Sequence, residues 1–204
     1  MNHHGSKTSN SQKWLEVVNQ KLTCGMAGAV SSSAVLERAV VICQEAIFNN
    51  NDVPTNKNGG AVYCAGTLRD TDSSYTYNDA KNGGAIFVAG GGNVRLIGNS
   101  AEKAIFQENT ATTSANGGAI YVQQNNSILY VEGYTFTENT SGNNTVVYIC
   151  ATCEATLKNI TFEGDAIQNI YVAGTLKYSA LSLTNAEIKP TSGAIVTNLT
   201  TGGN

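Results

Sequence analysis

Three places in the sequence gather side chains that can do chemistry. The first is the run Arg69–Asp72 (RDTD), with Asp79 close behind it, which offers carboxylates for calcium binding or acid–base catalysis. The only histidines, His3 and His4, lie far away in the N-terminal tail, so no histidine assists this run. We therefore interpret it as a solvated loop.

The second place is the pair Cys150 and Cys153, which has the spacing of half a zinc site or of a redox pair. No second CxxC pair and no histidine outside the tail supplies the remaining ligands, so we predict no metal and no cofactor. The third is Gly90–Gly92, which lacks the GxGxxG and GK[ST] patterns of phosphate-binding loops and is predicted to be a turn. Cys64 is expected in the core. Five cysteines are an odd number, which leaves the redox compartment open.

The composition favours short strands joined by many tight turns. Only 13% of the residues are charged, and the chain has 21 Gly but 2 Pro, with Asn, Thr and Ser filling the gaps between short apolar runs. The net charge is −3 and the basic residues are scattered, which argues against a nucleic-acid partner. We expect residues 1–11 to be a disordered or tag-like N-terminus and residues 12–204 to form one repeat domain, as a fragment of a longer protein.

A repeated tetrad sets the frame of that domain. GGAV at Gly59–Val62, GGAI at Gly83–Ile86 and GGAI at Gly117–Ile120 each follow an asparagine. The interval between successive tetrads is that of the repeats that form the coils of a solenoid. Weaker copies extend the series at both ends, and we align one apolar residue from each copy: Val30, Val62, Ile86, Ile120, Val147, Ile170 and Ile195.

A second marker, FxxN, closes the other half of each repeat. It occurs at Phe48–Asn51, Phe106–Asn109 and Phe136–Asn139, with a variant at Phe162–Asp165, and each copy follows a β-rich run. Each repeat thus reads as strand, turn, strand and a short strand that ends in an asparagine turn. The paired glycines allow a tight corner in which at least one residue needs a positive φ. We predict a right-handed, single-stranded parallel β-helix of about seven coils.

The segment Ser33–Phe48 also fits an amphipathic helix, with Glu37 and Arg38 on one face. Its last residues, AIFNNN, align with Lys103–Asn109 (KAIFQEN). We therefore predict strands here, and a helix that caps the solenoid is the alternative.

Alternation within the GGA strand separates an inner row from an outer row. Val62 and Cys64, and their counterparts in later repeats, are almost all β-branched and are expected to point inward. The opposite parity is predicted to form an external aromatic ladder, which is our candidate binding face: Tyr63, Phe87, Tyr121, Tyr148 and Tyr171. By the same parity we expect a second outer row two residues earlier: Ala61, Ala85, Ala119, Val146 and Asn169.

With both markers in place, the chain resembles the polymorphic membrane protein repeats of chlamydial type over roughly residues 27–197. The resemblance implies a β-helical passenger of an autotransporter, carried to the cell surface by a translocator that is absent from this chain. It also implies adhesion through the tetrads. Three of them begin here with the pairs Gly59 and Gly60, Gly83 and Gly84, and Gly117 and Gly118, and three run from Phe48 to Asn51, from Phe106 to Asn109 and from Phe136 to Asn139. The resemblance also makes a disulfide between Cys150 and Cys153, or between coils, one expectation, and the alternative is that both are small apolar or surface thiols.

Our leading hypothesis is a non-catalytic, adhesin-like binding or display module, located at the cell surface or outer membrane or secreted. Its expected partner is a host-surface glycan or protein. Two alternatives stay open. One is a carbohydrate-active β-helix enzyme, resembling a polysaccharide lyase or hydrolase, and the other is a stalk that only spaces other domains. Bound sugar without turnover favours the first hypothesis, and product release favours the enzyme.

Overall fold

A computed structural model describes the backbone of residues 15–200 except residues 19–20, 26–28, 31–33, 38–39, 54–55, 113–116 and 165, and it describes side chains from residue 40 onward. The expected tail, residues 1–11, lies outside this range, as does Asp165 of the FxxN variant. Every element in the described part is a β-strand. None of these residues forms a helix that could cross a membrane.

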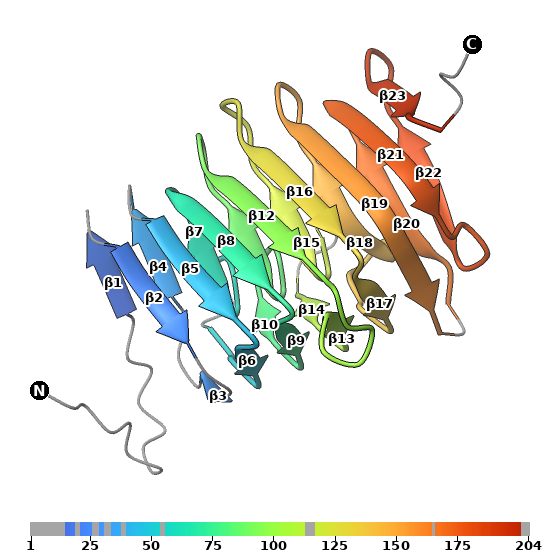
Figure 1. Ribbon diagram of the computed structural model, residues 1–204. Coiled ribbons are helices and arrows are strands. Elements are labelled where there is room, and N and C mark those ends of the chain that lie inside the picture. The colour runs from blue at the N-terminus through green and yellow to red at the C-terminus, as the bar shows by residue number, and fades with distance from the viewer. Residues whose placement is uncertain are drawn as a thin grey trace, which may run out of the picture.

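The first sheet contains the GGA strands. Its neighbours pair in parallel in the order β1, β4, β7, β11, β15, β18, β20 and β22. Their bounds are β1 (Leu15–Val18), β4 (Ala34–Glu37), β7 (Val62–Cys64), β11 (Ile86–Val88), β15 (Ile120–Val122), β18 (Thr145–Ile149), β20 (Gln168–Val172) and β22 (Ala186–Pro190). Figure 1 shows these strands repeating along the molecule from its N-terminal to its C-terminal end.

The second sheet contains the β-rich runs that precede the FxxN marker. It consists of β2 (Lys21–Gly25), β5 (Val40–Gln44), β8 (Thr67–Thr71), β12 (Asn93–Ile97), β16 (Ile128–Glu132), β19 (Glu154–Glu163), β21 (Thr175–Leu181) and β23 (Ile195–Asn198). The third sheet contains the FxxN strands β3 (Ala29–Val30), β6 (Ile47–Asn49), β9 (Ser74–Thr76), β13 (Ile105–Gln107) and β17 (Thr135–Thr137). Long strand β19 pairs with β16 through its first half and with β17 through its second half, which joins the two sheets. A short pair, β10 (Asp79–Ala80) and β14 (Thr110–Ala111), lies at the corner after the FxxN turn.

All pairings are parallel and join successive repeats, so the predicted all-β solenoid is confirmed. The strand prediction for Ser33–Phe48 is also confirmed, because this segment contains β4, β5 and the start of β6. Its β-branched and apolar residues alternate between buried and exposed along β5, as one face of a sheet requires.

The core fills the space enclosed by the three sheets. The predicted inner row of the first sheet is confirmed, because Val62, Ile86, Ile120, Val147 and Ile170 are at most 1% exposed. The second sheet contributes mainly leucine and valine, and the third contributes aromatic rings. Identical positions from successive coils therefore stack at about 4.8 Å, the spacing of neighbouring strands.

Two positions of the predicted alignment are wrong. Val30 pairs with Phe48 in the third sheet, and the residue that lies beside Val62 is Ala34. At the other end, Ile170 pairs with Ile188, whereas Ile195 pairs with Thr175 in the second sheet. The Gly-Ala-Val and Gly-Ala-Ile sequences at these ends lack the preceding Asn-Gly, so they do not mark the same corner.

The predicted outer row that begins at Ala61 is also wrong. Ala61, Ala85, Ala119 and Val146 are fully buried and belong to the core, and Asn169 is only 7% exposed. The backbone explains the error, because the N–H groups of Ala85 and Ile86 both donate to the carbonyl of Ala119, at 3.0 and 2.9 Å. Two donors on one acceptor form a bulge, so strict alternation does not extend back to the alanines.

The run Arg69–Asp72 is not a solvated loop, which corrects our interpretation. Residues 67–71 form strand β8, and its alternation places Leu68 and Asp70 inside and Arg69 outside. A threonine-rich strand with one charged residue facing each way gives a weak hydrophobic signal, and this is why the sequence suggested a loop.

Candidate functional site: corners, ladders and the outer aromatic row

The GGA corner uses its two glycines for different reasons. The first glycine is left-handed in every copy, with φ of +72° at Gly59, +61° at Gly83 and +65° at Gly117. The second approaches the next coil so closely that a Cβ at Gly84 would lie 2.2 Å from the carbonyl oxygen of Gly118. The expected positive φ is thus confirmed at the first glycine, whereas the second is fixed by close stacking of two backbones.

The FxxN asparagines form a buried ladder along one edge of the solenoid. Asn51, Asn109 and Asn139 are at most 3% exposed. The Nδ2 of Asn109 donates to the Oδ1 of Asn139 at 2.8 Å and to the carbonyl of Tyr75 at 2.8 Å. The same Oδ1 of Asn139 also accepts the backbone N–H of Asn109 at 3.1 Å. Asn109 therefore ties its own turn to the coils on both sides.

One rung of this ladder was missed from the sequence. Tyr75–Asn78 (YTYN) occupies the FxxN position between Phe48–Asn51 and Phe106–Asn109. The ring of Tyr75 stacks on Phe48 and on Phe106, with centroids 4.7 Å apart in both cases. A search for any aromatic residue three places before an asparagine would have found it.

The third residue of the FxxN turn is left-handed without being glycine. Asn50, Tyr77, Glu108 and Glu138 have φ between +50° and +56°. Gly164 takes this position in the variant, with φ of +110°. A left-handed residue followed by a buried asparagine is therefore the shared geometry of this corner, and the sequence motif records only the two buried positions.

Tyr75 also forms part of a polar cluster inside the solenoid. Its hydroxyl donates to the Oδ2 of Asp70 at 2.6 Å, the Ser73 hydroxyl donates to Oδ1, and the Tyr134 hydroxyl lies 3.4 Å from Oδ2. Burial raises the pKa of Asp70 to about 6, against the opposing effect of these hydrogen bonds. Asp70 is 2% exposed, so the cluster is an internal network and is closed to substrate.

The five outer aromatic residues lie in register on the first sheet. Their rings stack pairwise with centroid separations of 5.3, 5.1, 5.0 and 4.6 Å. Phe87 is only 2% exposed, because Tyr63 and Tyr121 cover its two faces. The four tyrosines are half-buried, so the ladder presents ring edges and hydroxyl groups to its surroundings.

Cys150 and Cys153 lie beside this ladder as free thiols, so the disulfide between them is not formed. The Cys150 thiol donates to the Tyr121 hydroxyl at 3.2 Å, and the Cys153 thiol donates to the carbonyl of Gln123 at 2.8 Å. Burial raises the pKa of both thiols, to about 11 at Cys153. Cys64 lies in the core as expected, and burial raises the pKa of its thiol to about 12. Among the described residues no group of His, Cys, Asp or Glu is arranged to hold a metal ion.

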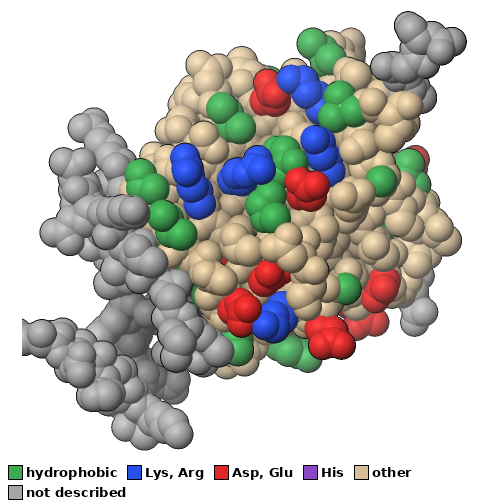
Figure 2. Space-filling model, in the orientation of Figure 1, with side chains coloured by type: hydrophobic (Ala, Val, Ile, Leu, Met, Phe, Trp, Pro, Cys, Tyr) green, Lys and Arg blue, Asp and Glu red, His purple; other side chains and the backbone are tan. Residues whose placement is uncertain are grey.

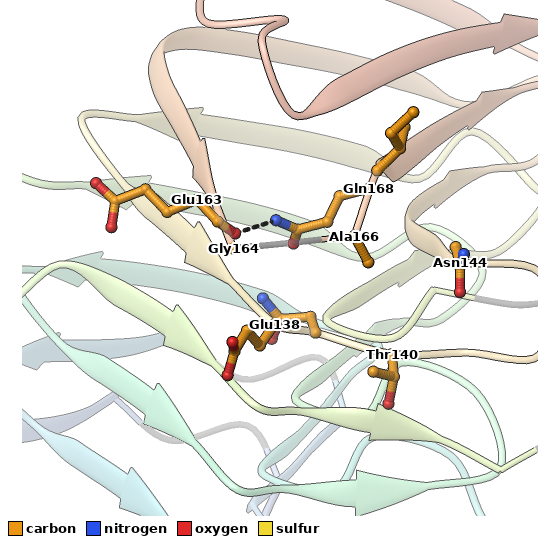
Figure 3. A pocket seen from close by; sticks show the side chains of 9 residues that line it. Glu138, Thr140, Asn144, Glu163, Gly164, Ala166 and Gln168 are labelled. Atoms are coloured by element: carbon orange, nitrogen blue, oxygen red, sulfur yellow. Dashed lines mark hydrogen bonds between the residues drawn. The ribbon is translucent and has the colours of Figure 1, made fainter.

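A shallow pocket lies where the FxxN corners of two coils meet the turn before β20 (Figure 3). Glu138 and Glu163 come from successive corners, and Gln168 forms the inner side. The Nε2 of Gln168 donates to the carbonyl of Glu163 at 2.7 Å, whereas its Oε1 has no partner. The remaining lining includes Ala166 and Ile167, and Ile167 is 57% exposed. The pocket thus combines two exposed carboxylates with an apolar wall.

The repeat geometry can now be compared with known proteins. Residues 93–123 match the family model of the Chlamydia polymorphic membrane protein (Chlamydia_PMP) repeat. This stretch runs from β12 through the Phe106–Asn109 turn and the Gly117–Ile120 corner to the end of β15. The resemblance to polymorphic membrane protein repeats is therefore confirmed. No curated protein and no solved structure gives a significant match to the chain.

In this chain the structure shows what the motif residues of the polymorphic membrane protein repeat do. Its Phe106 and Asn109 are interior stacking positions, and Gly118 is packed against the next coil. Gly117 is in turn required by its left-handed backbone. The residues that recur in the repeat are thus those that let one coil stack on the next.

Proposed function

We propose that this chain is a non-catalytic binding module displayed at a cell surface, within a polymorphic membrane protein of the autotransporter type. The observation that supports it is the aromatic ladder, a continuous row of stacked rings on the outside of a repeat matched to that family. Stacked tyrosines provide flat apolar surface together with hydroxyl groups, which suits sugar rings or a protein partner.

The distribution of charges argues for binding over catalysis. Arg69 and Asp70, the strongest catalytic candidates in the sequence, lie on opposite faces of β8, one outside and the other in the core. They cannot meet the same substrate. Asp70 is further committed to hydrogen bonds with Ser73 and Tyr75. The alternative of a carbohydrate-active enzyme therefore loses its best site.

The test is a double substitution of Tyr121→Ser and Tyr148→Ser, compared with Tyr77→Ser. Tyr77 is a matched control because it is 49% exposed and lies outside the ladder. The labelled proteins are incubated with cultured epithelial cells, and bound protein is quantified after far-UV circular dichroism has shown that each variant is folded. We expect the double variant to lose cell binding and the control to keep it. Unchanged binding by a folded double variant would leave the ladder with a stacking role only, whereas failure of the unchanged protein to bind cells would favour the stalk hypothesis.

A further inference from the structure

A second surface carries positive charge. It is the outer face of the second sheet, formed by the residues that alternate with the buried ones. The register places Ile42, Arg69, Arg95, Tyr130 and Thr156 side by side across β5, β8, β12, β16 and β19. Lys158 follows Thr156 two residues later on the same face. We call Arg69, Arg95, Tyr130 and Lys158 the arginine face. Figure 2 shows Lys and Arg side chains in a line over this sheet, with apolar and acidic side chains among them.

The two arginines are not neutralised by the protein. Arg69 and Arg95 are exposed neighbours on adjacent strands, and neither forms an ion pair with any described residue. Like charges at directly paired positions of a sheet are destabilising. Two carboxylates lie on the same face: Glu154 pairs with Lys177 at 2.6 Å, and Glu132 accepts the Tyr130 hydroxyl and lies beside Lys158. A chain of net charge −3 therefore holds a strip on one sheet in which cations outnumber carboxylates and the two arginines have no ion-pair partner among the described residues.

Tyr130 holds the cations against the sheet. The guanidinium carbon of Arg95 lies 4.0 Å from the centre of the Tyr130 ring, and the Lys158 ammonium lies 5.6 Å from it. Both distances are within the range of cation–π attraction. Stacking over the ring fixes the plane of the Arg95 guanidinium, and its N–H groups at the edge of that plane can then donate in pairs to a sulfate or carboxylate group.

The row of residues beside the two arginines is apolar or neutral across four strands. Val40 is 40% exposed and Ile128 is 45% exposed, and both lie on the same face as the arginines. They are separated by Thr67 and Asn93, which supply neutral hydrogen-bonding groups. A strip of this kind suits a ligand that alternates anionic groups with flat, weakly polar surface, as the rings of an acidic sugar do.

We propose that the arginine face binds an extended, sulfated or carboxylated polysaccharide. This proposal rests on the proposed binding function, but the surface that binds the polysaccharide is not the aromatic ladder. Nucleic acid fits less well, because the strip holds few cations and carries two carboxylates, whereas tracking a phosphate backbone needs many phosphate contacts. The register of a parallel sheet sets successive rows about 4.8 Å apart, so the ligand would lie across the strands along the solenoid axis.

The test measures binding to immobilised heparin at several salt concentrations. The variant Arg69→Gln with Arg95→Gln removes two charges from the arginine face. The matched control, Lys103→Gln with Lys189→Gln, removes two charges elsewhere, each from an exposed ion pair that contributes little to stability. We expect the arginine variant to bind at least tenfold more weakly, with a dependence of affinity on salt that is shallower by about two cation equivalents. The control should bind as the unchanged protein does.

Arg69→Lys with Arg95→Lys is expected to give an intermediate loss, because charge is kept and paired donation is removed. Failure of the unchanged protein to bind heparin would overturn the proposal. So would an equal loss of heparin binding in the Arg69→Gln, Arg95→Gln variant and in the Lys103→Gln, Lys189→Gln control. Equal competition by double-stranded DNA at the same charge concentration would also overturn it. The ladder variant Tyr121→Ser with Tyr148→Ser should bind heparin normally. Loss of cell binding in that variant together with normal heparin binding separates the two functions. Loss of heparin binding with normal cell binding in the Arg69→Gln, Arg95→Gln variant separates them as well.

Discussion

The side-chain amide of Asn78 donates a 2.8 Å hydrogen bond to the Oδ1 of Asn109, which belongs to the next coil. The same oxygen accepts the backbone N–H of Asn78 at 3.1 Å, while the Nδ2 of Asn78 also donates to the carbonyl of Phe48 on the other side. The Oδ1 of Asn78 in turn accepts the backbone N–H of Asn51, so a single side chain satisfies two backbone groups of the preceding coil. An amide is required because it alone offers two donors and an acceptor in this space.

The asparagine ladder predicts a large cost for Asn109→Ala. The change removes the acceptor for the backbone N–H and the Nδ2 of Asn78 and leaves the carbonyl of Tyr75 without its side-chain donor. The Oδ1 of Asn139 keeps only the backbone N–H of residue 109. Because buried groups without partners each cost about 1–3 kcal/mol, we expect the free energy of unfolding to fall by several kcal/mol. Urea unfolding followed by far-UV circular dichroism measures it. Asn143→Ala at an exposed position is the control, and an equal loss there would contradict the role of the ladder.

Alanine substitutions at two glycines of the same repeat should lower the free energy of unfolding by different amounts. At Gly84 an added Cβ would lie 2.2 Å from the Gly118 oxygen and 2.6 Å from the backbone of Thr110, so Gly84→Ala must push two coils apart. Gly91, at the following turn, has φ of +82° and no atom within 4 Å of an added Cβ. We expect Gly91→Ala to cost about 1 kcal/mol from its backbone conformation alone. Gly84→Ala should cost several times more in thermal or urea unfolding, and similar losses would show that coil spacing is not limiting.

The buried Asp70 predicts that stability falls as pH rises. Burial raises its pKa from 3.8 to about 6, so the folded chain binds the proton more tightly than the unfolded chain does. The favourable contribution is complete below about pH 4 and is lost as pH rises through 6, by about 3 kcal/mol in the free energy of unfolding. Asp70→Asn should remove this component when urea midpoints are measured from pH 4 to pH 7.

Asp72 provides the contrast for that measurement. Although partial burial acts to raise its pKa, the backbone N–H groups of Asn99 and Ser100 donate to its carboxylate, and the net effect lowers the pKa. Its contribution is therefore present at neutral pH and lost as pH falls, the opposite sign to Asp70. Because its contribution changes only below about pH 4, Asp72→Asn should leave the decline of stability between pH 4 and pH 7 in place. A profile unchanged in Asp70→Asn would contradict the assignment.

The substitution Tyr75→Phe should keep the ring stacking of this residue and remove its hydrogen bond. The ring stacks at 4.7 Å on Phe48 and Phe106 need no hydroxyl, and phenylalanine restores the FxxN motif. The substitution removes the 2.6 Å bond to Asp70 inside the solenoid. We expect a loss of about 1–3 kcal/mol at pH 7, as for a hydrogen bond to a buried charged group. Adding Asp70→Asn should abolish most of this difference, and a double-mutant cycle checks that coupling.

The sequence by itself determined the architecture and most of the corners. GGA and FxxN recur because each coil must turn at the same places and stack in register, so the same small or amide side chain is needed at every step. The inner row of the first sheet was predictable for the same reason, since β-branched residues at alternate positions mark a buried face. The aromatic ladder followed from the opposite parity.

Only the tertiary structure decided which imperfect copies belong to which rung. Ala34 pairs with Val62 although it lacks the motif, and Tyr75 replaces a phenylalanine, because the coil above and the coil below impose the register on whatever residue lies there. The interior place of Asp70 depends on hydroxyls from Tyr75 and from Tyr134, which is 64 residues away. The arginine face has the same origin, since Arg69 and Arg95 are far apart along the chain and become neighbours only when two coils stack in register.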